Sequence, residues 1–365
     1  MNKTVLVLAN NSGGLFRFRK ELLSELIQLN HKVIVSTPFD DHVSELLDMG
    51  IVLVETKINR RGMNPITDLN LILQYKKLIK MWKPDNIITY TIKPNLYGGL
   101  VASRYNIPFS INITGLGSVF QQDNIIRKMV ICWYKKICKN ASTVFFENSG
   151  NKNDFLKYKI TYDSKCIVLH GAGVNLEDFY FSKYPVNSKE TIFLFIGRIM
   201  KEKGIEELLW AIEKLNRDQI NVCLEILGSC EENYLETIKN YEEKGFVKYY
   251  GIQKDVRPYI EKSHCLVLPS YHEGMANVLL EAASMGRPLI TSNICGCKEA
   301  VNLGKNGLLV EVKNRNDLYK KMREFIKLSN DEKIKMSFES RKHMETYFDK
   351  KKVVKETILN LHLNS

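Results

Sequence analysis

The chain has 365 residues, of which 44% are hydrophobic and 26% are charged, and its formal net charge is +12. This length and composition are typical of a soluble protein with about two domains, each large enough to bury a core. They exclude a membrane-spanning protein, since no stretch approaches the roughly 20 apolar residues of a transmembrane helix, and we expect no signal peptide because the N-terminal apolar run is very short.

The basic excess lies mainly in the first half of the chain. Nucleic acid, an anionic membrane surface and a diphosphate-bearing substrate are the candidate partners for such a charge. The basic residues are not interleaved with stacking aromatic residues in any nucleic-acid-binding motif, so nucleic acid is the least favoured partner.

The first half of the chain alternates buried strands with amphipathic helices. Strands are predicted at 4–9, 33–37, 52–55, 86–90, 110–113, 143–146 and 167–169, and helices at 15–29, 68–82, 94–105 and 121–140. This alternation predicts an α/β fold with a parallel sheet and helices on both faces. Because ligands of such sheets bind beyond the carboxyl ends of the strands, the loops after Ala9, Tyr90 and Ile113 are candidate sites.

Gly13 and Gly14 lie in a turn predicted at 10–14, directly after the first strand. Glycines in such a turn let the backbone approach a ligand at a helix N-terminus. The complete Gly-x-Gly-x-x-Gly fingerprint is absent, so the sequence does not support dinucleotide binding.

The predicted helix 121–140 combines apolar and basic residues. The apolar stripe contains Ile125, Ile126, Met129, Val130, Trp133 and Ile137, and the charges are Arg127, Lys128, Lys135, Lys136 and Lys139. Two interpretations of this stretch remain open. The helix either lies on an anionic bilayer surface or packs in the core with a solvated basic face.

The second half repeats the alternation after a polar, loop-like junction that ends before Ser188. Strands are predicted at 192–196, 222–227, 247–250, 265–268, 289–292 and 308–310, and helices at 205–215, 256–262, 317–328 and 331–347. We therefore expect an N-terminal domain at 1–180, a second domain at 181–345, and a C-terminal helix at 346–365 that packs back on the first domain. The eight cysteines are scattered and form no Cys-x-x-Cys pair, so we expect free, buried thiols in a reducing cytoplasm.

The stretch 268–288, LPSYHEGMANVLLEAASMGRP, predicts a strand end, an acidic turn, a helix and a stop. Glu273 lies in the turn and Glu281 on the helix, and the N–H groups of Met275, Ala276 and Asn277 fall at the helix N-terminus. Such N–H groups hold anions, and carboxylates accept hydrogen bonds from hydroxyls. A sugar diphosphate has both kinds of group.

Arg198 and Lys203 lie just past another strand, in a loop bounded by glycines. Two cations five residues apart suit a diphosphate, because Arg binds it bidentately and Lys acts as a point charge. Each loop alone is an ordinary charged loop. The combination of cations, glycine turns and carboxylates at strand ends of one half predicts a site for a sugar diphosphate.

These residues lie in motifs that resemble the retaining glycosyltransferases of family 4, over nearly the whole chain. The motifs are GR-x4-KG at 197–204, EGMANVLLE at 273–281, GAGVNLEDF at 171–179 and KNGLLV at 305–310. TIKPNLYGG and ITGLGSVF are similar to bacterial enzymes that build lipid-linked oligosaccharides for capsule, O-antigen or protein glycosylation. SYHEGMANVLLEA and CGCKEAV resemble the subgroup that transfers an N-acetylhexosamine, such as GalNAc, onto an undecaprenyl-diphosphate-linked sugar.

The resemblance implies a GT-B fold, in which two Rossmann-like domains face a cleft and the second holds a UDP-sugar donor, without a metal or other cofactor. It implies catalytic roles for Arg198 and Lys203, which neutralise the donor diphosphate, and for Glu273, which binds the donor sugar hydroxyls. Glu281 would hold the ribose. The other donor-binding residues it implies are Gly274, Met275, Ala276, Asn277, Gly197 and Gly228.

In the first domain the resemblance implies an acceptor and diphosphate loop made by Gly13, Gly14, Thr114 and Gly115. Many family members carry His or Asp where this chain has Thr114, and a threonine cannot act as a general base. We therefore assign no base, and expect front-face attack in which the leaving phosphate takes the acceptor proton and the anomeric configuration is retained.

A lipid-linked acceptor favours the membrane interpretation of the helix 121–140. The contact residues would be Arg127, Lys128, Trp133, Lys135, Lys136 and Lys139. We therefore expect a cytoplasmic protein attached peripherally to the inner face of the plasma membrane. Two other functions remain open, namely a nucleotide-sugar 2-epimerase of similar architecture and, less favoured, a nucleic-acid-binding protein.

Overall fold

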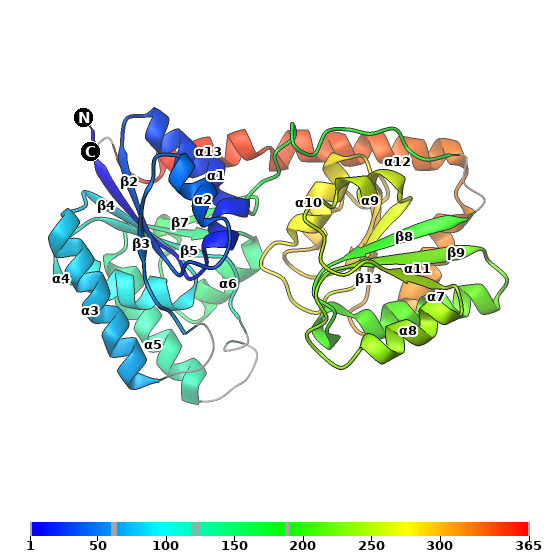
Figure 1. Cartoon of the computed structure of the whole chain (residues 1–365), viewed down its shortest axis with the longest axis horizontal. Coiled ribbons are helices and arrows are strands. Elements are labelled where there is room, and N and C mark those ends of the chain that lie inside the picture. Colours follow the sequence, from blue (N-terminus) through cyan, green and yellow to red (C-terminus); the bar gives the residue numbers. More distant parts are fainter. Residues whose placement is uncertain (1, 60–63, 118–119, 121–124, 187–189, 364–365) are drawn as a thin grey trace. The chain divides into compact units, whose positions relative to one another are not determined.

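The chain forms two compact units, each built on a β-sheet flanked by helices (Figure 1). A computed structural model describes residues 2–59, 64–117, 120, 125–186 and 190–363. Unit 1 is Met1–Ala172 together with Lys350–Ser365, and unit 2 is Gly173–Asp349. The predicted fold of two α/β domains with parallel sheets is confirmed.

Unit 1 has a seven-stranded sheet with the order β3-β2-β1-β4-β5-β6-β7. Its strands are β1 (Thr4–Leu8), β2 (Lys32–Thr37), β3 (Val52–Glu55), β4 (Asn86–Tyr90), β5 (Phe109–Ile113), β6 (Thr143–Phe146) and β7 (Cys166–Val168). All neighbours pair in parallel, so the carboxyl ends share one edge. The strand order reverses between β1 and β4, which is where sheets of this kind bind ligands.

Those helices of unit 1 that directly follow a strand begin at this carboxyl edge and return along the sheet. The helices of unit 1 are α1 (Ser12–Gln28), α2 (Val43–Asp48), α3 (Pro65–Trp82), the π-helix η1 (Pro94–Gly98), α4 (Gly99–Arg104), α5 (Ile125–Asn140), α6 (Ser149–Lys157), the short 3-10 helix η3 (Asp163–Lys165) and α13 (Lys350–Leu359). Helices α2 and α6 are not predicted by the sequence pattern. Both are short and mostly polar, so they carry little periodic signal.

Helix α1 begins earlier than predicted, and the predicted turn at 10–14 is wrong. The Asn11 side chain accepts a hydrogen bond from the Gly14 N–H and caps the helix. Gly13 and Gly14 therefore lie in the first turn of α1.

The two faces of the unit 1 sheet are covered by different helices. Leu6 and Leu8 share a core cluster with residues of α3, α4 and α5. Val5 and Val7 point the other way and share a cluster with residues of α1 and α13, as expected from the alternation of side chains along a strand. Thus α3 and α5 lie on the same face of the sheet.

Unit 2 has a six-stranded parallel sheet with the order β10-β9-β8-β11-β12-β13. Its strands are β8 (Thr191–Ile196), β9 (Val222–Leu227), β10 (Val247–Tyr249), β11 (Cys265–Leu268), β12 (Leu289–Ser292) and β13 (Gly307–Val310). Its helices are η4 (Lys201–Lys203), α7 (Ile205–Arg217), α8 (Leu235–Glu243), α9 (Arg257–Lys262), α10 (Asn277–Ser284), η5 (Lys298–Ala300), α11 (Arg315–Lys327), α12 (Asn330–His343) and the π-helix η6 (Met344–Phe348). Helix α8 is not predicted by the sequence pattern, and the helix predicted at 331–347 is α12 continued as η6.

The C-terminal segment belongs to unit 1. Lys350 Nζ donates to Phe18 O on α1 at 3.2 Å, and Asn86 Nδ2 donates to Leu361 O at 3.0 Å. The chain therefore leaves unit 1 after Ala172 and returns to it at Lys350. Among the described residues, no helix is both long enough and apolar enough to cross a bilayer.

Candidate active site

Glycines at the carboxyl edge of the unit 2 sheet let three strand-end loops approach one another. Gly228 follows β9 with φ +138°, and a Cβ there would lie 1.9 Å from Gly197 O, which follows β8. Gly204 has φ +72°, and a Cβ there would lie 2.3 Å from Pro269 O, which follows β11. Any side chain at these two positions would push the loops apart.

Lys203 and Glu273 form an ion pair at this edge. Lys203 Nζ contacts Glu273 Oε1, and the side chains are only 17% and 12% exposed. The Tyr271 N–H donates to Glu202 O at 2.8 Å and ties the two loops together. The structure thus brings together a cation and an acid that the sequence places 70 residues apart, in a partly buried position where charges interact more strongly than in water.

Arg198 lies in the loop after β8, at the same edge of the sheet, and its side chain is more exposed than those of Lys203 and Glu273. Its Nη1 is 2.9 Å from Glu231 Oε2, in side chains that are 48% and 32% exposed. Glu231 belongs to the loop after β9 and was not singled out from the sequence. An incoming phosphate would compete with Glu231 for the guanidinium.

The acidic turn before α10 rests on a second glycine loop. The Ala276 N–H donates to Gly296 O at 2.8 Å, and a Cβ on Gly296 would lie 2.6 Å from Gly274 O. The Gly296 N–H in turn donates to Glu299 Oε2 at 2.7 Å. The Ala276 N–H is therefore already used inside the chain. Asn277 is the first residue of α10, so the helix contains no carbonyl four residues before it that could accept a hydrogen bond from its N–H.

Asn277 and Glu281 are one helical turn apart on α10, so they lie on the same face of that helix. Both are half-buried. Asn277 Oδ1 is buried and, within the described part of the chain, has no hydrogen-bond partner. Buried polar atoms are normally bonded, so this atom is suited to a ligand group.

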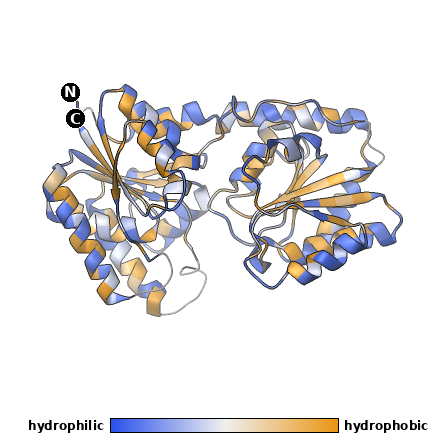
Figure 2. Ribbon diagram, in the orientation of Figure 1, coloured by the Kyte–Doolittle hydropathy of each residue, from blue (hydrophilic) through white to orange (hydrophobic). Residues whose placement is uncertain are grey.

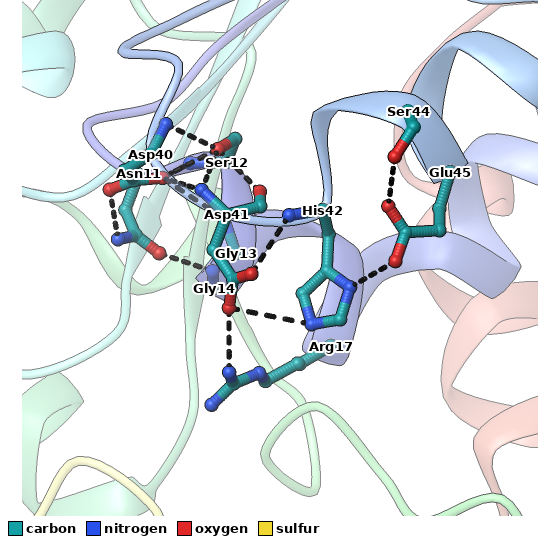
Figure 3. Close-up of polar contacts among 10 residues, drawn as sticks. All are labelled: Asn11, Ser12, Gly13, Gly14, Arg17, Asp40, Asp41, His42, Ser44 and Glu45. Atoms are coloured by element: carbon teal, nitrogen blue, oxygen red, sulfur yellow. Dashed lines mark hydrogen bonds and ion pairs between the residues drawn. The ribbon is translucent and has the colours of Figure 1, made fainter. Parts of the chain in front are cut away.

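In unit 1, the carboxylate of Asp40 binds the N–H groups at the start of α1 (Figure 3). Asp40 Oδ1 accepts from the Ser12 N–H at 2.9 Å and from the Gly13 N–H at 3.3 Å, while Asn11 Oδ1 accepts from the Gly14 N–H. The first N–H groups of α1 are thus engaged. The role expected for Gly13 and Gly14 remains a prediction, and a phosphate there would have to replace Asp40.

The loop between β2 and α2 adds further charged groups beside α1 (Figure 3). Asp41 Oδ2 is 2.8 Å from Arg17 Nη2, and His42, with φ +56°, has its Nδ1 2.8 Å from Glu45 Oε1. The hydrogen bond to His42 lowers the pKa of Glu45 to about 2. This loop is not predicted from the sequence, since it carries no recognisable spacing pattern.

Thr114 and Gly115 follow β5 directly, at the same edge of the unit 1 sheet. Gly115 has φ +149°, a backbone conformation that glycine adopts most readily. Both residues are half-buried. Their position agrees with a ligand loop, whereas their chemistry offers no base.

A buried ion pair near the carboxyl edge of the unit 1 sheet is also not predicted from the sequence. Arg19 Nη2 is 2.6 Å from Glu147 Oε1, in side chains that are 8% and 11% exposed, and the guanidinium lies 5.0 Å from the centre of the Tyr90 ring. Burial raises the pKa of Glu147, and the charge of Arg19 opposes this shift. Glu147 comes directly after β6. A charged residue at the end of a buried strand is therefore the sequence feature that could have indicated this ion pair.

Helix α5 presents two different faces. Val130 and Ile137 are buried in the core, whereas Ile125, Met129 and Trp133 are 74%, 46% and 40% exposed. The single stripe expected from the sequence is therefore wrong, because the helix packs on the sheet through one side and leaves the other uncovered. Arg127 lies 5.6 Å from the centre of the Tyr158 ring. Residues 121–124 of the predicted helix lie outside the described residues.

Comparisons with known proteins match both units. A family model described as "Glycosyl transferases group 1" matches residues 177–348, and one described as "Glycosyl transferase 4-like" matches residues 4–148. The chain is 28% identical, over 90% of each chain, to the N,N'-diacetylbacillosaminyl-diphospho-undecaprenol alpha-1,3-N-acetylgalactosaminyltransferase of Campylobacter jejuni. It is 25% identical to the UDP-Gal:alpha-D-GlcNAc-diphosphoundecaprenol alpha-1,3-galactosyltransferase of Escherichia coli, over 74% of this chain and 73% of that one.

Solved structures agree on the fold. A glycosyltransferase from Rickettsia africae matches with a TM-score of 0.79 at 21% identity, over the whole length of both chains. At this level of identity the likeness bears on the fold alone.

Proposed function

Because the chain belongs to the glycosyltransferases, with one family model matching each unit, we propose that it moves an N-acetylhexosamine, such as GalNAc, from a UDP-sugar to an undecaprenyl-diphosphate-linked saccharide. The names of the Campylobacter jejuni and Escherichia coli relatives support this acceptor class, and the latter name supports a UDP-linked donor. The epimerase alternative has no support among these relatives, which are named as transferases.

The contact between Lys203 and Glu273 carries the proposal. It joins a cation suited to the donor diphosphate with an acid suited to the sugar hydroxyls, at the edge of the sheet where ligands bind. A donor bound here would have its diphosphate beside Lys203 and Arg198 and its sugar beside Glu273. Asn277 and Glu281 on one face of α10 would hold the nucleoside end, with Glu281 on the ribose.

In the proposed reaction, the bond between the anomeric carbon and the β-phosphate oxygen breaks as the acceptor hydroxyl oxygen forms a new bond to that carbon on the same face. The hydroxyl proton passes to the departing phosphate oxygen, so no protein base is required. Arg198 and Lys203 stabilise the negative charge that develops on the leaving diphosphate, which is the task a metal performs in other enzymes. The reaction therefore retains the anomeric configuration and is independent of added metal.

The stereochemistry tests this mechanism. The proton NMR spectrum of the product should contain an α-anomeric signal for the new linkage when the donor is α-linked, and the rate should be unchanged when EDTA is present. A β-linked product would rule out same-face transfer, and loss of activity in EDTA would rule out metal-independent catalysis.

We also propose that the protein associates peripherally with the inner face of the plasma membrane through α5. Lys135, Lys136 and Lys139 are exposed near the end of this helix. Each lysine near an anionic surface contributes about 1 kcal/mol, so replacing the three by Glu should lower binding to anionic vesicles by at least on the order of a hundredfold in a sedimentation assay.

The matched control replaces three exposed lysines of unit 2, Lys320, Lys327 and Lys335, by Glu. This variant carries the same change in net charge and should keep its vesicle binding within a few fold. Equal loss in both variants would mean that net charge, rather than α5, governs the binding.

A further inference from the structure

Helix α3 carries an exposed apolar row that the core does not use. Ile66, Leu69 and Leu73 are 73%, 56% and 52% exposed, and their spacing of three and four residues places them on one face of the helix. The core face of α3 is formed by other residues, among them Leu71, Tyr75 and Leu78.

The same face of α3 becomes basic toward the end of the helix. Lys76, Lys77 and Lys80 follow the apolar row at helical spacing and are exposed. Helix α5 has a related arrangement, with exposed Ile125 and Met129 near its start and exposed Lys135, Lys136 and Lys139 near its end. Exposed Lys128 and Trp133 lie between these two groups. Both helices therefore carry exposed apolar residues at the start and a group of exposed lysines at the end.

The two helices are held together by η1, and both pack on the same face of the sheet (Figure 1). Lys93, just before η1, is 2.7 Å from Asp68 of α3 in a pair whose side chains are 13% and 12% exposed. Tyr97 of η1 contacts Trp133 of α5 edge to face, with ring centres 5.8 Å apart. Figure 2 shows hydrophobic residues along α3 and at the lower end of α5.

The direction in which α3 and α5 run determines which edge of the sheet their apolar first halves lie near. In a parallel α/β sheet each helix that follows a strand begins at the carboxyl edge and runs back toward the other edge. The first halves of α3 and α5 therefore both lie toward the carboxyl edge of unit 1, which is also the edge of Thr114 and Gly115. The groups of lysines at the ends of the two helices, Lys76, Lys77 and Lys80 on α3 and Lys135, Lys136 and Lys139 on α5, lie farther from that edge.

We propose that α3 and α5 together form one bilayer-contact surface, with the carboxyl edge of the unit 1 sheet turned toward an anionic phospholipid membrane. Ile66, Leu69 and Leu73 enter the interface beside Ile125, Met129 and Trp133, while the lysines of both helices contact lipid phosphates. An apolar row bordered by cations is the chemistry of a helix lying in an anionic bilayer surface. This inference rests on the proposed function, because the surface would serve to bring a lipid-linked acceptor to the carboxyl edge of the unit 1 sheet.

The test replaces Ile66, Leu69 and Leu73 by Gln in the full chain. Gln keeps a favourable helix propensity and leaves every charge in place, so a loss of binding cannot arise from electrostatics. We expect at least tenfold weaker partition into vesicles of phosphatidylglycerol and phosphatidylethanolamine. The control replaces Leu235, Ile252 and Leu359 by Gln, which are 58%, 75% and 69% exposed on other surfaces, and should bind as the unchanged protein does.

A second measurement reports the position of α3 directly. Leu69→Trp should be quenched by brominated lipids in these vesicles, whereas Leu235→Trp should not. Unchanged partition of the α3 variant, or equal quenching at the two positions, would overturn the proposal, as would a change of oligomeric state in place of a change in vesicle binding.

Activity on a short-chain, water-soluble polyprenyl-diphosphate sugar separates the two proposals. The α3 variant should use this acceptor at the unchanged rate in the absence of vesicles. If the unchanged protein itself fails to use it while the vesicle results hold, the proposed function is wrong and the membrane surface stands.

Discussion

Replacing Lys203 by alanine is expected to lower kcat for sugar transfer by about a hundred- to a thousandfold, the usual effect of removing a group that stabilises transition-state charge. The variant loses the cation that faces the leaving diphosphate, and it also leaves the Glu273 carboxylate, 12% exposed, without its partner. Glu273→Gln should lower kcat as well, since the amide keeps the shape but loses the charge that accepts sugar hydroxyls most strongly.

Lys201 provides the matched control for Lys203. It lies in the same short helix η4, its side chain is 63% exposed, and its ammonium is 3.9 Å from Glu206. Lys201→Ala should stay within about twofold of the unchanged rate, as expected for an exposed pair of little energetic weight. Circular dichroism and thermal melting of all variants check that the fold is intact, and a Lys203→Ala rate near the unchanged value would refute the assignment of that residue.

Replacing Arg19 by methionine is expected to cost about 3–5 kcal/mol in the free energy of unfolding, because it leaves the carboxylate of Glu147 buried without its partner. Urea or guanidinium unfolding at pH 7 measures this loss. Arg17→Met on the same helix is the control. Its pair with Asp41 is exposed, at 61% and 55%, so its removal should cost no more than about 1 kcal/mol.

The effect of Arg19→Met should depend on pH in a definite direction. Burial raises the pKa of Glu147 above its ordinary value, and Arg19 opposes the shift. A carboxyl whose pKa is raised by folding binds protons more tightly in the folded state, so its contribution to stability falls as pH rises through that interval. Without Arg19 this penalty grows, and the variant should be closer to the unchanged protein at pH 5 than at pH 7. An equal loss at both pH values would contradict a buried, uncompensated carboxylate.

Strand positions followed from the sequence because buried parallel strands are short runs of apolar residues. β4, β6, β9, β11 and β12 have the bounds predicted for them. Helix starts were harder, because a side-chain cap decides them, as Asn11 does for α1. Short polar helices such as α8 bury too few residues to produce a periodic pattern.

The candidate site was predictable where chemistry and strand ends coincide. Lys203 and Glu273 were both expected at carboxyl ends of strands in one half of the chain. Their direct contact was not predicted, and it arises because β8 and β11 are neighbours in the sheet. Arg19 and Glu147 were not, because their pairing depends on how α1 packs over β4 and β6, which no local spacing encodes. Asp40 was missed for the same reason, since its carboxylate reaches the start of α1 from a different loop.

One measurement tests the proposed transfer most directly. The protein is incubated with a panel of UDP-sugars, including UDP-GalNAc, and with synthetic polyprenyl-diphosphate sugars, and the products are identified by mass spectrometry. We predict a lipid-linked product heavier by one N-acetylhexosamine, formed only when donor and acceptor are both present. Conversion of the UDP-sugar without an acceptor, or the absence of any lipid-linked product across the whole panel, would contradict the proposed function.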